Sequence, residues 1–128
     1  MTDEPKAKIR SFRDLRVWQK AVDLVVTCYG LTKRLPPDER FGLISQIQRA
    51  AVSIPANIAE GYARRTRGDY VRHLAIAGGS LAELETHWEI VLRLGFLKND
   101  DLIQFAAQSS AVGKMLEVLM QKLTVRKP

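Results

Sequence analysis

The residue types that most often carry catalysis are sparse in this chain, and their spacing does not build a site. His73 and His87 lie on one expected helix, fourteen residues apart or about 20 Å along the axis, so they cannot share a metal. Cys28 has no basic residue within a helical turn to lower its pKa, so we expect a buried, unreactive thiol. A glycine-rich phosphate loop, an HExxH pair and a nucleophile elbow are absent from the sequence. We therefore expect no enzymatic activity, no metal and no cofactor.

Basic residues, in contrast, are numerous and unevenly placed. The chain has 128 residues with 20 Lys and Arg against 14 Asp and Glu, a formal charge of +6. Such cations bind the phosphate groups of nucleic acids, and the affinity then falls steeply with salt. The alternative is that they only keep the surface solvated. The candidate nucleic-acid-binding residues are Arg64, Arg65, Arg67, Arg72, Lys122, Arg126 and Lys127, joined by Lys6, Lys8, Arg10 and Arg13 near the N-terminus.

A line of polar residues runs along the second expected helix, beside its apolar stripe, and consists of Gln46, Arg49, Ser53, Asn57 and Glu60. If the second and third helices are antiparallel neighbours that turn near residue 66, residues whose numbers add to about 132 lie level. This register predicts a structural ion pair between Arg49 and Glu83. It predicts a second pair between Glu60 and Arg72, and it places Ser53 opposite Gly79. A ligand pocket around Arg49 and Asn57 is the functional alternative.

Four amphipathic segments position these residues. Apolar residues spaced three and four apart predict helices from about Asp14 to Arg34, from Pro37 to Gly61, from about residue 69 to 95 and from about residue 99 to 123. Pro55 lies inside the second segment, but the apolar stripe continues past it in phase, so we expect one bent helix. The third segment has the most regular stripe, formed by Tyr70, Leu74, Ala77, Leu81, Leu84, Trp88 and Val91.

The first segment is apolar around much of its circumference. Its stripe of three-and-four spacing is Leu15, Trp18, Val22, Val25 and Tyr29. Other apolar residues lie off that stripe, namely Val17, Leu24, Val26 and Leu31. So wide an apolar surface suggests a subunit interface, and the alternative is a helix set deeply in its own bundle.

Four such helices with short joints predict an all-α, up-down-up-down four-helix bundle. We expect a basic N-terminal arm over residues 1–12, the bundle over 13–123 and a basic tail over 124–128. This topology places the basic segments together at one end of the bundle. No apolar run is long enough to span a membrane, no signal peptide is present, and a single cysteine suits a reducing compartment, so we expect a cytoplasmic protein without a membrane partner.

Three stretches carry a family resemblance: FRDL at 12–15 with VWQKA at 17–21, SQI at 45–47 with RAAVSIPANIAEG at 49–61, and GSLAELE at 79–85. Over residues 12–123 the chain resembles the four-helix-bundle proteins encoded in intervening sequences of bacterial 23S ribosomal RNA genes. The resemblance implies a ring-like homopentamer with no established enzymatic activity. That family is also similar to the accessory proteins of diversity-generating retroelements, pentameric bundles that bind nucleic acid and a reverse transcriptase.

These observations lead to two hypotheses of different classes. The first is a non-enzymatic, homo-oligomeric protein that binds the backbone of RNA or DNA through its basic end. The second is a protein–protein assembly or adaptor module with no nucleic-acid role, which binds a partner such as a reverse transcriptase, or another protein, through the outer faces of its ring.

Overall fold

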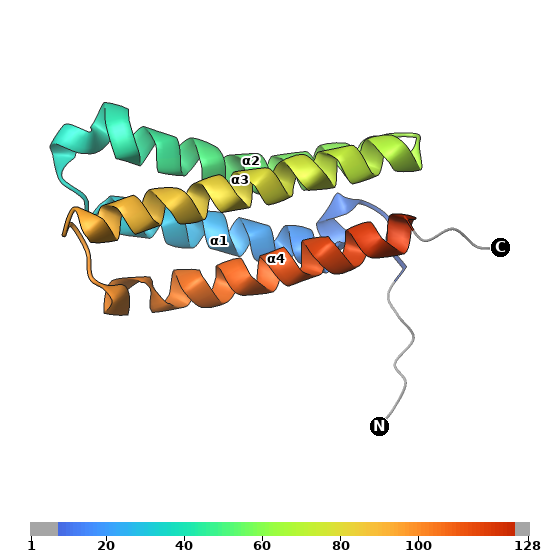
Figure 1. Cartoon of the computed structure of the whole chain (residues 1–128). Helices are drawn as coiled ribbons and strands as arrows, with labels where there is room; N and C mark the ends of the chain where they lie inside the picture. Colours follow the sequence, from blue (N-terminus) through green and yellow to red (C-terminus); the bar gives the residue numbers. More distant parts are fainter. Residues whose placement is uncertain (1–7, 125–128) are drawn as a thin grey trace, which may run out of the picture.

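Four helices run alternately up and down around one core in the computed structural model, which describes residues 8–124 (Figure 1). The long helices are α1 (Arg16–Thr32), α2 (Ser45–Ala63), α3 (Arg67–Arg93) and α4 (Ile103–Thr124). Short helical turns lie between or before them, η1 (Phe12–Asp14), η2 (Pro37–Glu39), η3 (Arg40–Ile44) and η4 (Asn99–Leu102). The predicted all-α four-helix bundle is thus confirmed, and residues 8–124 contain no strand.

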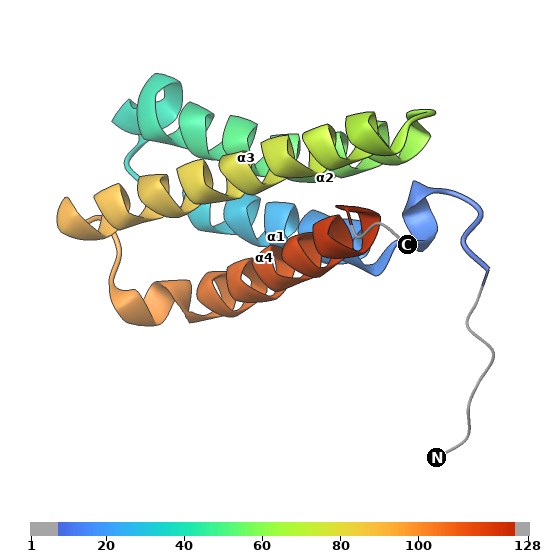
Figure 2. The ribbon, with the colours of Figure 1, turned by 45° about the vertical axis from the view of Figure 1, so that its right-hand side comes forward.

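The helices form two antiparallel pairs. α2 packs closely on α3, α1 lies beside α2 and α4, and α4 lies beside α1 and α3. Figure 2 shows the α1–α4 pair beneath the α2–α3 pair. Each helix therefore presents one face to a shared core and another to a neighbour, which the three-and-four spacing of apolar residues permits.

α3 supplies the central stripe of the core, as its periodicity predicted. Leu74, Ala77, Leu84 and Val91 are fully buried, and Trp88 is 1% exposed. Burial of each large side chain contributes about 1.5–3 kcal/mol, so this seam stabilises the bundle strongly. Tyr70, the first residue of the predicted stripe, is half-buried at the edge of the core.

The face of α1 that enters the core differs from the prediction. The buried residues are Val17, Ala21, Leu24, Cys28 and Thr32. The predicted stripe lies beside it instead: Leu15, Trp18, Val22 and Val25 are half-buried, and Tyr29 is 41% exposed. Both stripes have helical spacing, but the one with the small side chains of Ala21 and Cys28 lets α1 approach its neighbours more closely.

α2 begins later than predicted and then continues without interruption through Pro55, which is buried. Residues 37–44 form the η2 and η3 turns rather than α-helix, and Gly42 leaves helical geometry with φ −107° and ψ −110°. The carboxylate of Glu39 accepts a hydrogen bond from the Leu43 N–H at 3.2 Å, which satisfies a donor freed by this irregular turn.

The register of α2 on α3 is close to the prediction. The Ser53 hydroxyl lies 2.8 Å from the Ser80 hydroxyl, one residue away from the expected partner Gly79. Gly79 itself is exposed, and a side chain there would contact nothing within 4 Å. The close approach is made by Gly61 instead, where a Cβ would lie 2.9 Å from the Cβ of His73.

Candidate nucleic-acid interface

One end of the bundle gathers the basic segments, as the topology predicted. Figure 1 shows the start of α1, the end of α4 and the α2–α3 joint at the same end of the molecule. We call this the basic end and define it as residues 8–16, 60–72 and 117–124, which hold nine Lys and Arg against four Asp and Glu. The opposite end, residues 33–40 and 89–101, holds five of each. The molecule is therefore electrically polarised along its long axis.

The α2–α3 joint is short because both helices are capped within it. Arg64 ends α2, and its N–H donates to the Gly61 carbonyl at 3.1 Å. Thr66 caps α3, and its hydroxyl accepts a hydrogen bond from the Asp69 N–H at 3.1 Å. Arg64, Arg65 and Arg67 are all exposed, so three guanidinium groups occupy four positions of one tight turn.

Two arginines of the basic end are paired with acids on their own helix or joint. Arg64 Nη2 lies 2.5 Å from Glu60 Oε2, and Arg72 Nη2 lies 3.7 Å from Asp69 Oδ1. The predicted Glu60–Arg72 pair is therefore wrong. His73, and not Arg72, is the α3 residue that faces Glu60: its Nε2 lies 3.7 Å from Glu60 Oε2. Arg72, one residue earlier on α3, points to solvent.

Other cations of the basic end have no acidic partner. Among residues 8–124, Arg65, Arg67 and Lys122 make no ion pair. All three are exposed. Their charges are therefore available to an anion from solution. Arg126, Lys127 and Lys6, which the sequence also placed in the site, lie outside the described residues.

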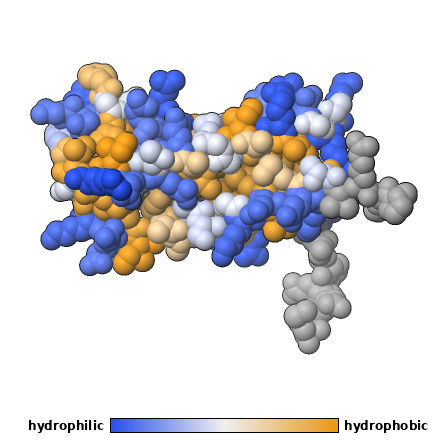
Figure 3. All heavy atoms as spheres, viewed as in Figure 1, coloured by the Kyte–Doolittle hydropathy of each residue, from blue (hydrophilic) through white to orange (hydrophobic). Residues whose placement is uncertain are grey.

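Arg67 and Lys122 lie on different sides of the C-terminal end of α4, Arg67 on the side of α3 and Lys122 on the side of α1. Arg67, Gly68 and Val71 of α3 border an open hollow of about 570 Å³ together with Leu123 and Thr124 of α4. Lys122 turns toward α1 and Leu15. The first turn of α3 also adds the partial positive charge of a helix N-terminus beside Arg67. In Figure 3, hydrophilic side chains lie at both ends of the bundle, so the two ends differ in net charge and not in hydrophilicity.

The aromatic residues near the joint stack on each other instead of forming a platform for bases. The rings of Tyr62 and Tyr70 are 6.1 Å apart and perpendicular, and both residues are half-buried. Burial, with a smaller contribution from Tyr62, raises the pKa of Tyr70. The joint therefore offers charge but no aromatic face for base stacking.

The predicted Arg49–Glu83 ion pair is also wrong. Both residues line a polar hollow of about 300 Å³ with Gln46, Ser53 and Ser80, but the ion pairs of the described chain do not include them. Arg49 and Glu83 are both exposed. An ion pair between two exposed side chains contributes only about 0–1 kcal/mol, because water already stabilises both charges. Register between α2 and α3 therefore depends on other contacts.

A partly buried hydrogen-bond chain supplies those contacts, and sequence reasoning missed its centre. Asn57 Nδ2 donates to the Ser53 carbonyl at 2.9 Å and to the Ser53 hydroxyl at 3.0 Å. Asn57 Oδ1 then faces His73 Nδ1 at 3.1 Å, so Nδ1 carries the proton and donates. His73 itself is buried, at 5% exposed. Two features of the sequence indicate this chain of hydrogen bonds. Ser53 and Asn57 are four residues apart on one face of α2, and the antiparallel register places residue 73 of α3 close to the height of Asn57.

Residues with possible redox or metal chemistry do not form a site. Burial raises the pKa of the Cys28 thiol to about 11, and the nearby Trp88 side chain offsets this only in part. Over the part of the chain that the structure describes, no three His, Cys, Asp or Glu side chains are grouped to hold a metal ion. The helices found in residues 8–124 also include none that is long and apolar enough to cross a membrane.

The fold and the sequence both match a known family. A crystal structure of a protein of unknown function from the S23 ribosomal protein family of Bacteroides thetaiotaomicron VPI-5482 superimposes with a TM-score of 0.76 and 26% identity, covering 82% of this chain and 98% of that one. No curated protein sequence matches the chain. Residues 13–118 match the family model described as 23S rRNA-intervening sequence protein. Since this match spans nearly the whole bundle and includes the α2–α3 joint, the chain belongs to the 23S rRNA-intervening sequence protein family.

Proposed function

We propose that this protein is a non-enzymatic, cytoplasmic nucleic-acid-binding protein that contacts the phosphate backbone of RNA or DNA through its basic end. The observation that supports the proposal is the contrast between the two ends of the bundle, one with nine cations and four acids and the other with five of each. Arg65, Arg67 and Lys122 carry this excess, since they are exposed and form no ion pair among residues 8–124.

Backbone contact fits the basic end better than base recognition does. Guanidinium and ammonium groups bind phosphate oxygens whatever the sequence of the nucleic acid. Recognition of bases would need amide, guanidinium or aromatic groups on an element that fits into a groove of the nucleic acid. The aromatic rings near the joint, those of Tyr62 and Tyr70, pack against each other and are therefore not free to stack on bases. The proposed binding is therefore weakly dependent on sequence and strongly dependent on salt.

We also propose that the protein acts as a homo-oligomer. Exposed apolar side chains on the α1–α2 side support this: Val26 is 66% exposed, Phe41 is 89% exposed and Val52 is 44% exposed. Tyr29, Phe41 and Val52 border the same open hollow of about 590 Å³. Exposed apolar surface of this kind supports a subunit interface, and the family resemblance implies a ring of five.

A salt titration with matched charge variants tests the nucleic-acid proposal. Affinity for a duplex DNA and for a single-stranded RNA is measured by fluorescence anisotropy at several salt concentrations. The logarithm of the binding constant is expected to fall with slopes of about −0.9 per phosphate on the duplex and about −0.7 per phosphate on the single strand. Arg65→Glu with Arg67→Glu is expected to weaken both and to reduce the slope by about two.

The control places the same charge change at the neutral end. Lys33→Glu with Lys98→Glu alters the net charge by the same amount on two exposed residues far from the basic end. We expect this variant to lose much less affinity than the Arg65, Arg67 variant, because the Debye length is only about 10 Å at 0.1 M salt. Equal losses in the two variants, or no binding of either nucleic acid by the wild-type protein, would reject the proposal.

A further inference from the structure

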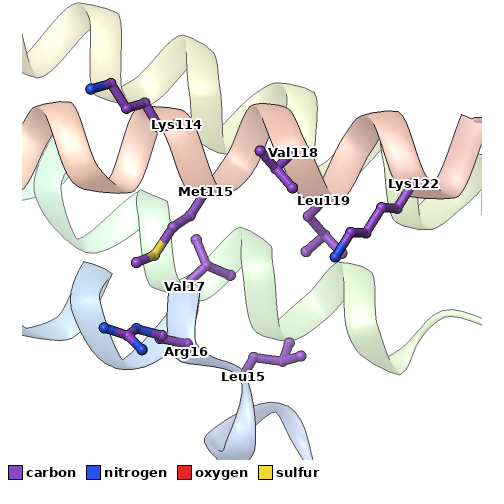
Figure 4. Close-up of a pocket in the computed structure, with 8 residues that line it drawn as sticks. All are labelled: Leu15, Arg16, Val17, Lys114, Met115, Val118, Leu119 and Lys122. Atoms are coloured by element: carbon purple, nitrogen blue, oxygen red, sulfur yellow. The ribbon is translucent and has the colours of Figure 1, made fainter. Parts of the chain in front are cut away.

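We infer that the groove between the start of α1 and the second half of α4 is a docking site for an acidic amphipathic helix of a partner protein. The groove has a volume of about 340 Å³, and its floor is apolar. The floor side chains are Leu15, Val17, Met115, Val118 and Leu119. Figure 4 shows Met115 and Leu119 of α4 extending toward Val17 at the start of α1. This inference goes beyond the proposed nucleic-acid function, since it concerns an apolar groove that adjoins the basic end and shares Lys122 with it, and another class of partner.

The apolar side chains of the groove floor are partly exposed to solvent, as expected for an interface whose partner is absent. Val118 is 49% exposed, whereas Val17 beneath it is 6% exposed. Leu15, Met115 and Leu119 are half-buried. Covering such side chains contributes about 25 cal/mol for each Å² of apolar surface removed from water. An apolar occupant would therefore gain free energy here, whereas a phosphate backbone would find no polar partner on the floor.

The rim of the groove is cationic. Arg16 comes from α1, and Lys114 and Lys122 come from α4. None of the three has an ion-pair partner among residues 8–124, and no acidic residue lines the groove. An occupant with acidic side chains beside an apolar stripe would satisfy both the rim and the floor.

The length of the groove favours a helix over a small amphiphile. Lys114 and Lys122 are eight residues apart on α4, about 12 Å along the axis, which matches the distance over two turns of a docked helix. A helix places anchors at i, i+3 or i+4, and i+7, with room for acidic residues on both flanks. A single carboxylate, such as that of a fatty acid, would neutralise one of three separated cations and leave the open groove largely uncovered.

The experiment uses three synthetic peptides of 18 residues, each blocked at both ends and carrying a fluorophore. The first has leucines at three-and-four spacing flanked by glutamates, the second has the same residues in an order that destroys the stripe, and the third has lysines in place of the glutamates. The full-length protein is expected to bind only the first peptide. Equal binding of the shuffled peptide would overturn the inference, because charge alone would then explain the interaction.

Matched variants locate the binding. Val118→Asn leaves the net charge unchanged and alters a side chain that is already half in water, so the fold is expected to survive. We expect the affinity for the first peptide to fall at least tenfold, while the nucleic-acid affinity, which depends on the cations of the basic end and not on the uncharged Val118, changes much less. Ile76→Asn, at a 41% exposed residue of α3 outside the groove, is the control and is expected to change neither. An unchanged peptide affinity in Val118→Asn would contradict the inference.

A charge swap tests the rim separately. Arg16→Glu with Lys114→Glu is expected to lower the affinity for the glutamate peptide at least tenfold and to create binding of the lysine peptide.

Light scattering on Val118→Asn tests whether the groove instead holds a second copy of this chain or the nucleic acid. A changed mass would assign the groove to a second copy of this chain, and a loss of nucleic-acid affinity would assign it to the nucleic acid; either result would overturn the inference, whether or not the proposed nucleic-acid function holds.

Discussion

Single side chains at the two ends of this bundle have different tasks. At the basic end, Arg65 and Arg67 are held in solvent by a short, capped joint. At the opposite end, Asp101 connects elements that are distant in the sequence: it accepts hydrogen bonds from the Lys98 N–H at 2.8 Å and from Arg34 Nη2 at 3.0 Å. The first end leaves its positive charge available to a ligand, and the second uses an ion pair to join the segment after α1 to η4.

Asp101 gives the protein a predictable acid sensitivity. The Lys98 N–H and, secondarily, Arg34 favour the ionised carboxylate and lower the pKa of Asp101 from its usual 3.8. A lowered folded-state pKa stabilises the protein above the unfolded-state value, and this contribution is lost as the pH falls through the folded-state value. Asp101→Asn is therefore expected to unfold at lower urea concentration than the wild type near pH 7, and the gap is expected to narrow as the pH falls below 3.8 and through the lowered folded-state pKa. A gap that stays constant from pH 7 to pH 3 would argue against an ionic contribution.

Cys28 is expected to resist modification in the folded protein. It is fully buried, and a pKa of about 11 leaves only about one thiol in a thousand ionised at pH 8. Iodoacetamide should therefore alkylate Cys28 only when urea unfolds the chain, at a rate that follows the unfolded fraction. Mass spectrometry across a urea titration measures this directly, and rapid labelling without urea would show that the core around α1 opens locally.

The pairing of α2 with α3 is the element-scale feature that positions the basic joint. Gly61 lies at the end of α2, and a Cβ there would meet His73 Cβ at 2.9 Å and the Tyr70 carbonyl oxygen at 3.2 Å. Beside it, Asn57 and His73 connect the two helices by a partly buried hydrogen bond. Steric fit and hydrogen bonding at the root of the joint therefore fix where Arg64 and Arg67 are presented.

Substitutions at two glycines distinguish the effect of close packing on stability from the effect of helix propensity. Gly61→Ala is expected to destabilise the fold by about 1–2 kcal/mol, since the overpacking cost exceeds the gain in helix propensity. Gly79→Ala, where a Cβ contacts nothing within 4 Å in the middle of α3, is expected to stabilise the fold by about 0.5–1 kcal/mol. Urea unfolding of the two variants measures both values, and a stabilised Gly61→Ala would show that α2 and α3 are more loosely packed than described.

The whole molecule is a polarised rod with distinct sides. Its charge excess lies at one end, its exposed apolar residues Phe41, Val26 and Val52 lie on the α1–α2 side, and a cation-rimmed groove lies on the α1–α4 side. Self-association through the α1–α2 side would leave both the basic end and the groove free. Assembly would then be compatible with nucleic-acid contact and with partner docking, while these two activities would compete for Lys122.

The self-association is expected to depend on Phe41. Phe41→Ser removes a ring that is 89% exposed, so it should lower the mass measured by light scattering without lowering the urea midpoint of the protomer. Ile103→Ser, at a 65% exposed residue of α4, is the matched control and should leave the mass unchanged. A wild-type mass equal to one chain would reject the oligomer outright.

The sequence by itself determined the helices, the topology and the end at which the basic residues meet, because apolar periodicity and breaker residues are local properties and short joints force antiparallel neighbours. It also set the register of α2 on α3 to within one residue, as the Ser53–Ser80 contact shows. Only the tertiary structure decided which of two apolar stripes of α1 enters the core, because both have helical spacing and the choice depends on how closely the neighbours can pack. It likewise decided that Glu60 lies beside His73 rather than Arg72, and that a groove exists between α1 and α4, since a shared surface is created only when two helices are brought together.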